Sequence, residues 1–132
     1  MTDSTGSRAG AVVFARDVDR MASFYAAALD LAAVDRDDEH VLLESPGFQL
    51  VVRQVPERLA ARIRITDPPE RRSGAAVKLV FFVPSIEDVR LAAAEHGGEM
   101  DASPKEWTFR GWRVWDGLDP EGNVIQFRAP AA

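Results

Sequence analysis

The chain has 132 residues, of which 46% are hydrophobic and 28% are charged, and its formal net charge is −5. This length fits one domain, and the composition is that of an ordinary globular protein rather than a disordered one. The net negative charge argues against a nucleic-acid partner, which requires a concentrated basic face. Because the sequence contains no cysteine, disulfides and thiolate metal sites are excluded.

Nothing in the sequence indicates a membrane partner or export. No apolar run approaches the roughly 20 residues that a membrane-spanning helix needs. The first eight residues lack the apolar segment of a secretory signal, and we expect residues 1–8 to form a disordered tail. The cytoplasm is therefore the expected location.

The first half of the chain reads as a strand, a helix and three more strands. Residues 11–15 form a short apolar run, which indicates a buried strand. Asp17 offers a helix N-cap, and apolar residues recur after it at helical spacing as far as about Asp30. Turn residues then separate strand-like segments at 32–36, 39–44 and 48–55.

The same order restarts after a connection that contains Asp67-Pro68-Pro69 and a short helical piece near 56–61. Residues 77–83 are strand-like, and Ser85 with Asp88 forms a capping box for a helix that ends at Gly97-Gly98. Further strands are predicted at 99–102, 107–116 and 124–128, the last two joined by a tight turn at 119–122.

The pattern β-α-β-β-β therefore occurs twice in one domain, residues 9–129. The modules span about 9–55 and 76–129, with the connection at about 56–75. The helix caps Asp17 and Ser85 lie 68 residues apart, and the glycines of the two final turns, Gly47 and Gly122, lie 75 apart. Since each module would expose one apolar sheet face, the two modules are expected to pair.

These features resemble the vicinal oxygen chelate superfamily, which includes glyoxalase I, bleomycin-resistance proteins and dioxygenases. The resemblance lies in the paired modules, the Arg16-Asp17-Val18 start, the Phe24-Tyr25 pair and the closing segment 119–127. It implies an α+β fold whose two modules form a curved, mixed, eight-stranded sheet around a ligand cup. It also implies a homodimer, since family members commonly pair such modules between chains.

Enzymes of this superfamily usually hold a divalent metal at four strand positions. The resemblance maps these positions to Gly10, Val51, Lys78 and Gln126. Glycine and valine offer no ligating atom, an ammonium group repels a cation, and only Gln126 has a suitable oxygen, whereas such sites need three or four ligands. We therefore expect neither a metal nor another cofactor.

The same four positions, together with Trp107 and Trp112, are the candidate ligand-binding residues. Strand alternation puts Lys78 and Gln126 on the cup side, where a cation suits an anionic or acceptor group. Lys78 could instead form a structural ion pair. The two tryptophans could stack a planar ligand or belong to a packed sheet or dimer face.

The leading hypothesis is a metal-independent protein that binds a small organic molecule in the cup, such as an anionic aromatic or antibiotic-like compound. The alternative is a lyase, isomerase or dioxygenase of the same superfamily, either metal-dependent or using Lys78 or a cup carboxylate. Whether the protein is an enzyme stays open at this point. A third possibility is a module that binds a partner and has a filled cup.

Overall fold

The computed structural model describes residues 7–102 and 106–131. Most of the predicted tail, residues 1–8, lies outside them. The first module contains β1 (Ala9–Ala15), α1 (Val18–Leu29), β2 (Ala32–Arg36), β3 (His40–Ser45) and β4 (Phe48–Gln54), and the connection contains α2 (Glu57–Ala60). The second module contains β5 (Leu79–Phe82), α3 (Ile86–Glu95), β6 (Glu99–Met100), β7 (Trp107–Phe109), β8 (Trp112–Leu118) and β9 (Val124–Pro130).

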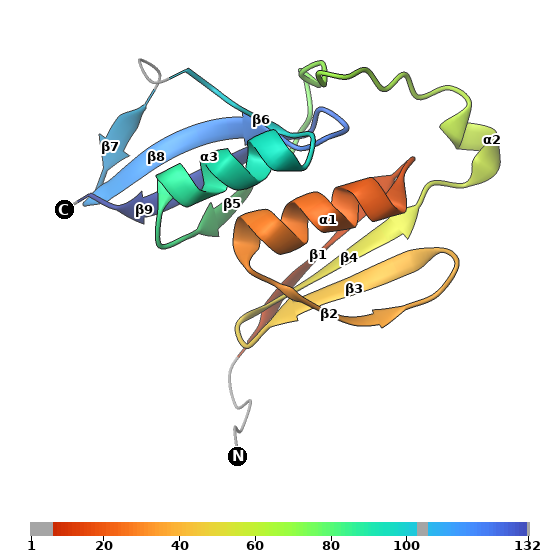
Figure 1. Ribbon diagram of the computed structural model, residues 1–132, viewed down its shortest axis with the longest axis horizontal. Helices are drawn as coiled ribbons and strands as arrows, with labels where there is room; N and C mark the ends of the chain where they lie inside the picture. Colours follow the sequence, from red (N-terminus) through yellow and green to blue (C-terminus); the bar gives the residue numbers. More distant parts are fainter. Residues whose placement is uncertain (1–6, 103–105, 132) are drawn as a thin grey trace.

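Each module forms its own mixed sheet. The first has the strand order β1-β4-β3-β2, and the second has the order β5-β9-β8-β6 with β7 also paired to β8. The strands β1/β4 and β5/β9 are parallel, and the other pairs are antiparallel. Figure 1 shows α1 and α3 side by side on the same side of the two sheets, and the two helices contact each other.

The register of the sheets confirms the repeat predicted from the sequence. Val12 pairs with Val51 in the first sheet, and Val80 pairs with Gln126 in the second. Val80 follows Val12 by 68 residues, and Gln126 follows Val51 by 75 residues, which are the two separations found in the sequence. The α+β class and the paired βαβββ modules are also confirmed, with the strands divided between a four-stranded and a five-stranded sheet.

The predicted helix boundaries are confirmed as well. The Asp17 side chain accepts a hydrogen bond from the Arg20 backbone N–H at 3.1 Å, as an N-cap does. The Ser85 hydroxyl accepts one from the Asp88 N–H at 3.2 Å. At the other end of α1, Asp30 has a left-handed backbone with φ of 53°.

The prediction of one strand over residues 107–116 is wrong. This segment is a β-hairpin in which Arg110 and Gly111 separate β7 from β8. Both have positive φ, 51° and 85°, as a two-residue hairpin turn requires. Glycine adopts this conformation without cost, but arginine seldom does, so the turn is hard to recognise inside an aromatic-rich run.

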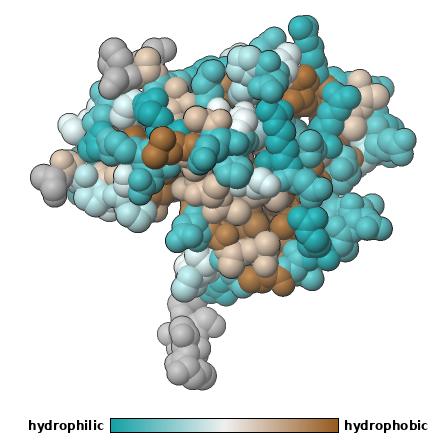
Figure 2. Space-filling view, viewed as in Figure 1, coloured by the Kyte–Doolittle hydropathy of each residue, from teal (hydrophilic) through white to brown (hydrophobic). Residues whose placement is uncertain are grey.

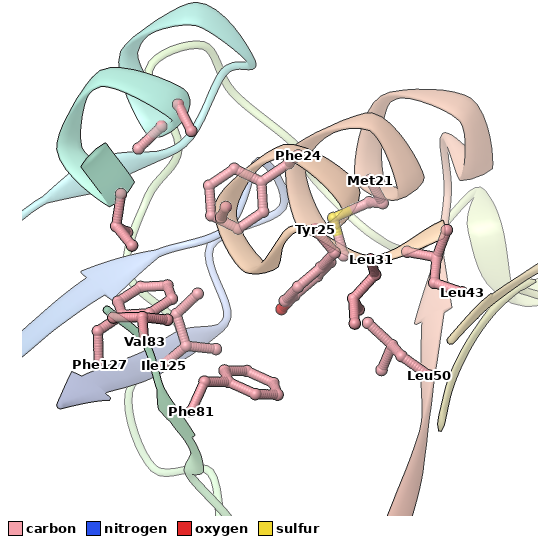
Figure 3. Close-up of a cluster of buried hydrophobic side chains, with 14 of the residues drawn as sticks. Met21, Phe24, Tyr25, Leu31, Leu43, Leu50, Phe81, Val83, Ile125 and Phe127 are labelled. Carbon is pink, nitrogen blue, oxygen red and sulfur yellow. The ribbon is translucent and has the colours of Figure 1, made fainter. Parts of the chain in front are cut away.

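One hydrophobic core joins the two modules through α1. Figure 3 shows Leu43 and Leu50 of the first sheet on one side of α1, and Ile125 and Phe127 of the second sheet on the other. Tyr25 of α1 reaches toward the second sheet, where its ring lies 6.2 Å from that of Phe81. Because these side chains are almost fully buried, the hydrophobic effect holds the two sheets under a shared helical layer.

Candidate functional site

Each sheet has one face turned away from α1 and α3, which we call the open face. Alternation along the strands decides which side chains lie there. In the second sheet the register groups on this face Val80 and Phe82 of β5, Gln126 and Arg128 of β9, and Trp112, Val114 and Asp116 of β8.

A chain of polar side chains crosses the open face of the second sheet. The Lys78 ammonium donates to Oδ2 of Asp116 at 2.8 Å, and the Gln126 amide donates to Oδ1 of the same carboxylate at 3.0 Å. The Gln126 carbonyl oxygen accepts a hydrogen bond from Nε of Arg128 at 2.9 Å. Because Gln126 is buried, these bonds fix the orientation of its amide and of the Arg128 guanidinium.

Aromatic rings surround the guanidinium of Arg128. Its Cζ lies 5.3 Å from the ring centroid of Phe109 and 5.8 Å from that of Phe82, within the range of cation–π attraction. The Phe82 ring meets the Trp112 ring edge to face at 4.8 Å. We call these four residues with Gln126 the Arg128 cluster. It presents exposed aromatic surface, since Phe82 is 58% and Phe109 is 42% exposed.

The tryptophans divide between the two faces of the second sheet. Trp112 lies in the Arg128 cluster, and Trp107 on β7 lies 6.0 Å from the Phe109 ring. Trp115 instead faces the helical layer, where it is buried under the Arg90 guanidinium at 4.2 Å. The hairpin therefore brings Trp107 and Trp112 to the open face.

The structure brings together some of the predicted site residues. Lys78 and Gln126 meet at the Asp116 carboxylate, so the ion pair that the sequence left open for Lys78 is formed. The Lys78 side chain is nevertheless 44% exposed. Gly10 and Val51 lie in the other sheet, where they pair with Gln49 and Val12.

Arg128 is a candidate that the sequence pattern did not single out. Its alternation with Gln126 along β9 was visible, but its aromatic neighbours come from β5, β7 and β8. Only the hairpin at Arg110 and Gly111 places Phe109 near the guanidinium. Missing that turn therefore hid the cluster.

The metal site of the superfamily does not fit these residues. Of the four mapped positions only Gln126 has a ligating oxygen, and that oxygen accepts the hydrogen bond of Arg128. An arginine and a lysine nearby add positive charge that opposes a cation. Within residues 7–102 and 106–131, no cluster of three histidine, cysteine or acidic side chains could hold a metal ion.

Two cavities lie where the sheets approach each other. One of about 310 Å³ is lined by residues of β1 and by Leu79, Val124 and Ile125, among others. A smaller one of about 200 Å³ is lined by Phe48 of the first sheet and by Val80 and Phe82 of the second. The second cavity therefore reaches the edge of the Arg128 cluster.

Comparison with known proteins supports this description of the fold. A family model for a glyoxalase-like domain matches residues 10–127. A glyoxalase/bleomycin resistance protein from Albidiferax ferrireducens has 20% identity and a TM-score of 0.64, covering 92% of this chain and 96% of its own. The TioX protein from Micromonospora sp. has 17% identity and a TM-score of 0.64, with 95% and 99% covered.

A third similar structure is the fosfomycin resistance protein FosX from Listeria monocytogenes, with 13% identity and a TM-score of 0.64, covering 97% of this chain and 94% of its own. No curated protein sequence gives a significant match. At these identities the solved structures show the fold alone.

The family match covers most of the chain. The protein is a glyoxalase-like member of the vicinal oxygen chelate superfamily, and it belongs to the glyoxalase-like domain family. In the part of the chain that the structure describes, no helix is long and apolar enough to cross a membrane.

Proposed function

We propose that the protein is a metal-independent binder of a small aromatic compound that carries an anionic or acceptor group. The ligand lies on the open face of the second sheet, against the Arg128 cluster. The observation that carries this proposal is the guanidinium of Arg128, which lies beside two exposed phenylalanine rings and is oriented by Gln126.

The charge of this face favours an anion. Lys78 and Arg128 contribute two positive charges, and Asp116 contributes one negative charge. Among the residues that the structure describes, the two terminal nitrogens of Arg128 have no hydrogen-bond partner. A planar guanidinium with free N–H groups matches the two oxygens of a carboxylate. Lys78, with its exposed ammonium, is proposed as a second contact.

The aromatic surface supports the second part of the proposal. Phe82, Phe109 and Trp107 leave ring surface exposed, and Trp112 closes one side. Planar ligands gain both burial of apolar area and ring stacking on such a surface. By the resemblance, Gly10 and Val51 of the first sheet form the opposite wall, where small side chains leave room for a ring.

Binding is favoured over acid–base catalysis by the state of Lys78 and Asp116. A general acid or base must lie within hydrogen-bond reach of the substrate atom with which it exchanges a proton. These two groups are hydrogen-bonded to each other, and Gln126 occupies the second carboxylate oxygen.

Calorimetric titration with 2-naphthoate tests the proposal, with 2-naphthylmethanol as the uncharged control. Wild type is expected to prefer the carboxylate. Arg128→Met is expected to weaken naphthoate binding by ~10- to 150-fold, because a hydrogen bond to a charged group contributes about 1.5–3 kcal/mol. Lys78→Met should weaken it less.

The exposed Arg58 of α2 supplies the matched control, since Arg58→Met removes an equal charge elsewhere. Equal binding of naphthoate to wild type, Arg128→Met and Lys78→Met would contradict the proposal.

We also propose that the protein forms a homodimer, as the resemblance implies. Edge strands with unpaired backbone groups need cover, and β2 is an edge strand whose residues are all exposed. Figure 2 shows hydrophobic surface gathered in the region of β2, where Val34 is 52% exposed. A second copy paired along β2 would cover both.

A further inference from the structure

The internal repeat duplicates part of the Arg128 cluster in the first sheet. Phe14 of β1 pairs with Arg53 of β4, as Phe82 of β5 pairs with Arg128 of β9. The same separations of 68 and 75 residues relate the two phenylalanines and the two arginines. Phe14 is 56% exposed, so its ring is as accessible as that of Phe82. Each open face therefore carries a phenylalanine beside an arginine.

The Phe14–Arg53 pair of the first sheet borders a separate cavity. This cavity has a volume of about 520 Å³, which is within the range of small-molecule sites. Its lining combines an aromatic ring, apolar side chains and groups of both charges, among them Phe14, Val55, Pro56, Arg53, Glu39 and Glu57.

The charges distinguish this cavity from the Arg128 cluster. Arg53 lies 3.6 Å from the Glu39 carboxylate, and both side chains are exposed, at 48% and 68%. An exposed pair at this distance contributes little stability, so a ligand can separate its members at low cost. Glu57 adds a second carboxylate to the lining. The cavity therefore offers one cationic and two anionic groups around apolar surface.

We infer that the open face of the first sheet carries a second ligand subsite, formed around Phe14 and Arg53, for a zwitterion of the α-amino acid type with an apolar side chain. Arg53 binds the carboxylate, as Arg128 does in the proposed site of the second sheet. Glu39 and Glu57 bind the ammonium group. The ring of Phe14, with Val55 and Pro56, covers the apolar side chain.

Three probes of similar shape test both charge requirements by calorimetry in the Arg128→Met protein, in which the proposed aromatic-anion site of the second sheet is weakened; the substitutions below are made in this protein. L-phenylalanine carries both charges, 3-phenylpropanoate lacks the ammonium, and phenethylamine lacks the carboxylate. L-phenylalanine is expected to bind at least about tenfold more tightly than either analogue, since each charged contact removed costs at least that much. In NMR spectra its binding should shift the amide signals of Gln54, Val55 and Glu57.

Substitutions test the carboxylate contact and the ammonium contact separately. Arg53→Met should weaken L-phenylalanine binding about tenfold and leave phenethylamine binding unchanged, whereas Glu57→Gln should weaken both. Phe14→Leu should weaken all three probes. Leu91→Ala, at an exposed apolar residue of α3 outside both sites, is the control and should change none. Both charged positions are exposed, so thermal unfolding should confirm intact folding.

The inference is overturned if L-phenylalanine fails to bind the Arg128→Met protein at millimolar concentration, or if adding Arg53→Met to that protein leaves its binding unchanged. It is also overturned if Leu91→Ala has the same effect as Phe14→Leu. Naphthoate binding at Arg128 is expected to persist in the single variant Arg53→Met, because Arg53 lies in the first sheet and Arg128 in the second. Its persistence in Arg53→Met therefore separates failure of this inference from failure of the proposed function.

Discussion

Glu121 fastens the last turn of the chain to the start of the first helix. The residue is 4% exposed, and its carboxylate accepts the backbone N–H of Arg16 at 2.8 and 2.9 Å and that of Asp17 at 2.8 Å. These donors lie just before α1, where a negative charge also suits the helix dipole. One side chain of the second module thus holds the first helix in place.

Glu121→Gln is expected to lower the free energy of unfolding by on the order of 2 kcal/mol, because an amide has one accepting oxygen and turns a donor toward a backbone donor. Urea denaturation measures this change. Glu95→Gln, at the exposed end of α3, is the control and should change little. An equal effect of both substitutions would show that Glu121 carries no special contribution.

Tyr25 and Asp119 form a second contact between α1 and the same turn. The Tyr25 hydroxyl donates to Oδ2 of Asp119 at 2.7 Å, and Asn123 donates its side-chain amide to the same oxygen at 2.7 Å. Burial, reinforced by the Asp119 charge, raises the pKa of the Tyr25 phenol well above its ordinary value. Ionisation of this tyrosine is therefore disfavoured in the fold.

This contact predicts a loss of stability in alkali. In the unfolded chain Tyr25 loses its proton near pH 10, while in the fold it keeps it, so its contribution is complete below about pH 10 and is lost as the pH rises further. Tyr25→Phe should be less stable by about 1–3 kcal/mol at neutral pH, since Asp119 loses a donor. Its unfolding free energy should also fall less steeply above pH 10. If urea denaturation gave wild type and Tyr25→Phe unfolding free energies that fall in parallel above pH 10, this prediction would be contradicted.

At the scale of elements, the β7–β8 hairpin carries much of the candidate site. Arg113 of β8 binds Glu106, just before β7, at 2.9 and 3.0 Å, and Glu87 of α3 at 2.9 and 3.2 Å. These hydrogen bonds hold the pKa of both carboxyls below its ordinary value. The arginine thus joins the hairpin to α3 and positions Trp107 and Phe109 over the open face.

Arg113→Met is expected to weaken the attachment of β7 to β8 and α3. Arg113 itself does not contact the proposed ligand. Protection of the amides of Trp107 and Phe109 from hydrogen exchange should fall, while that of the β3–β4 pairing should not. Because the pKa values of Glu87 and Glu106 are lowered, wild type should show a similar loss only as the pH falls below about 4. Unchanged protection of β7 in the variant would show that pairing with β8 suffices.

At the scale of the molecule, the sequence predicts the two modules, their helix caps and their common register. These features depend on local patterns, such as Asp17 before α1 and the alternation along β9, and local patterns are visible in sequence. The turn at Arg110-Gly111 was missed because one of its residues is atypical. That error merged two strands and concealed the Arg128 cluster.

Contacts between distant segments could not be predicted in the same way. Neither the pairing of Lys78 with Asp116 nor the bonds of Glu121 to the start of α1 follows from a residue's own neighbours in the chain. Both depend on how β5, β8 and the final turn come together in space. The sequence allows Lys78 either to contact a ligand or to form an ion pair, and it does not identify Asp116 as the partner.

The proposed homodimer also belongs to this scale. Sedimentation velocity at tens of micromolar is expected to show a dimer. If a second copy covers the β2 edge, Val34→Lys should shift the equilibrium toward monomer, because the charge would be buried in the interface. Leu91→Lys on α3, at another exposed apolar residue, is the control. Sedimentation of wild type as a monomer throughout would contradict the dimer.

The central claim is that a small aromatic anion binds against Arg128 on the open face of the second sheet. Its most direct test is isotope-filtered NMR of the protein with bound 2-naphthoate. The structure predicts intermolecular contacts from the naphthalene ring to Phe82, Phe109 and Trp112. Contacts confined to the first sheet or to the helical layer would contradict the claim.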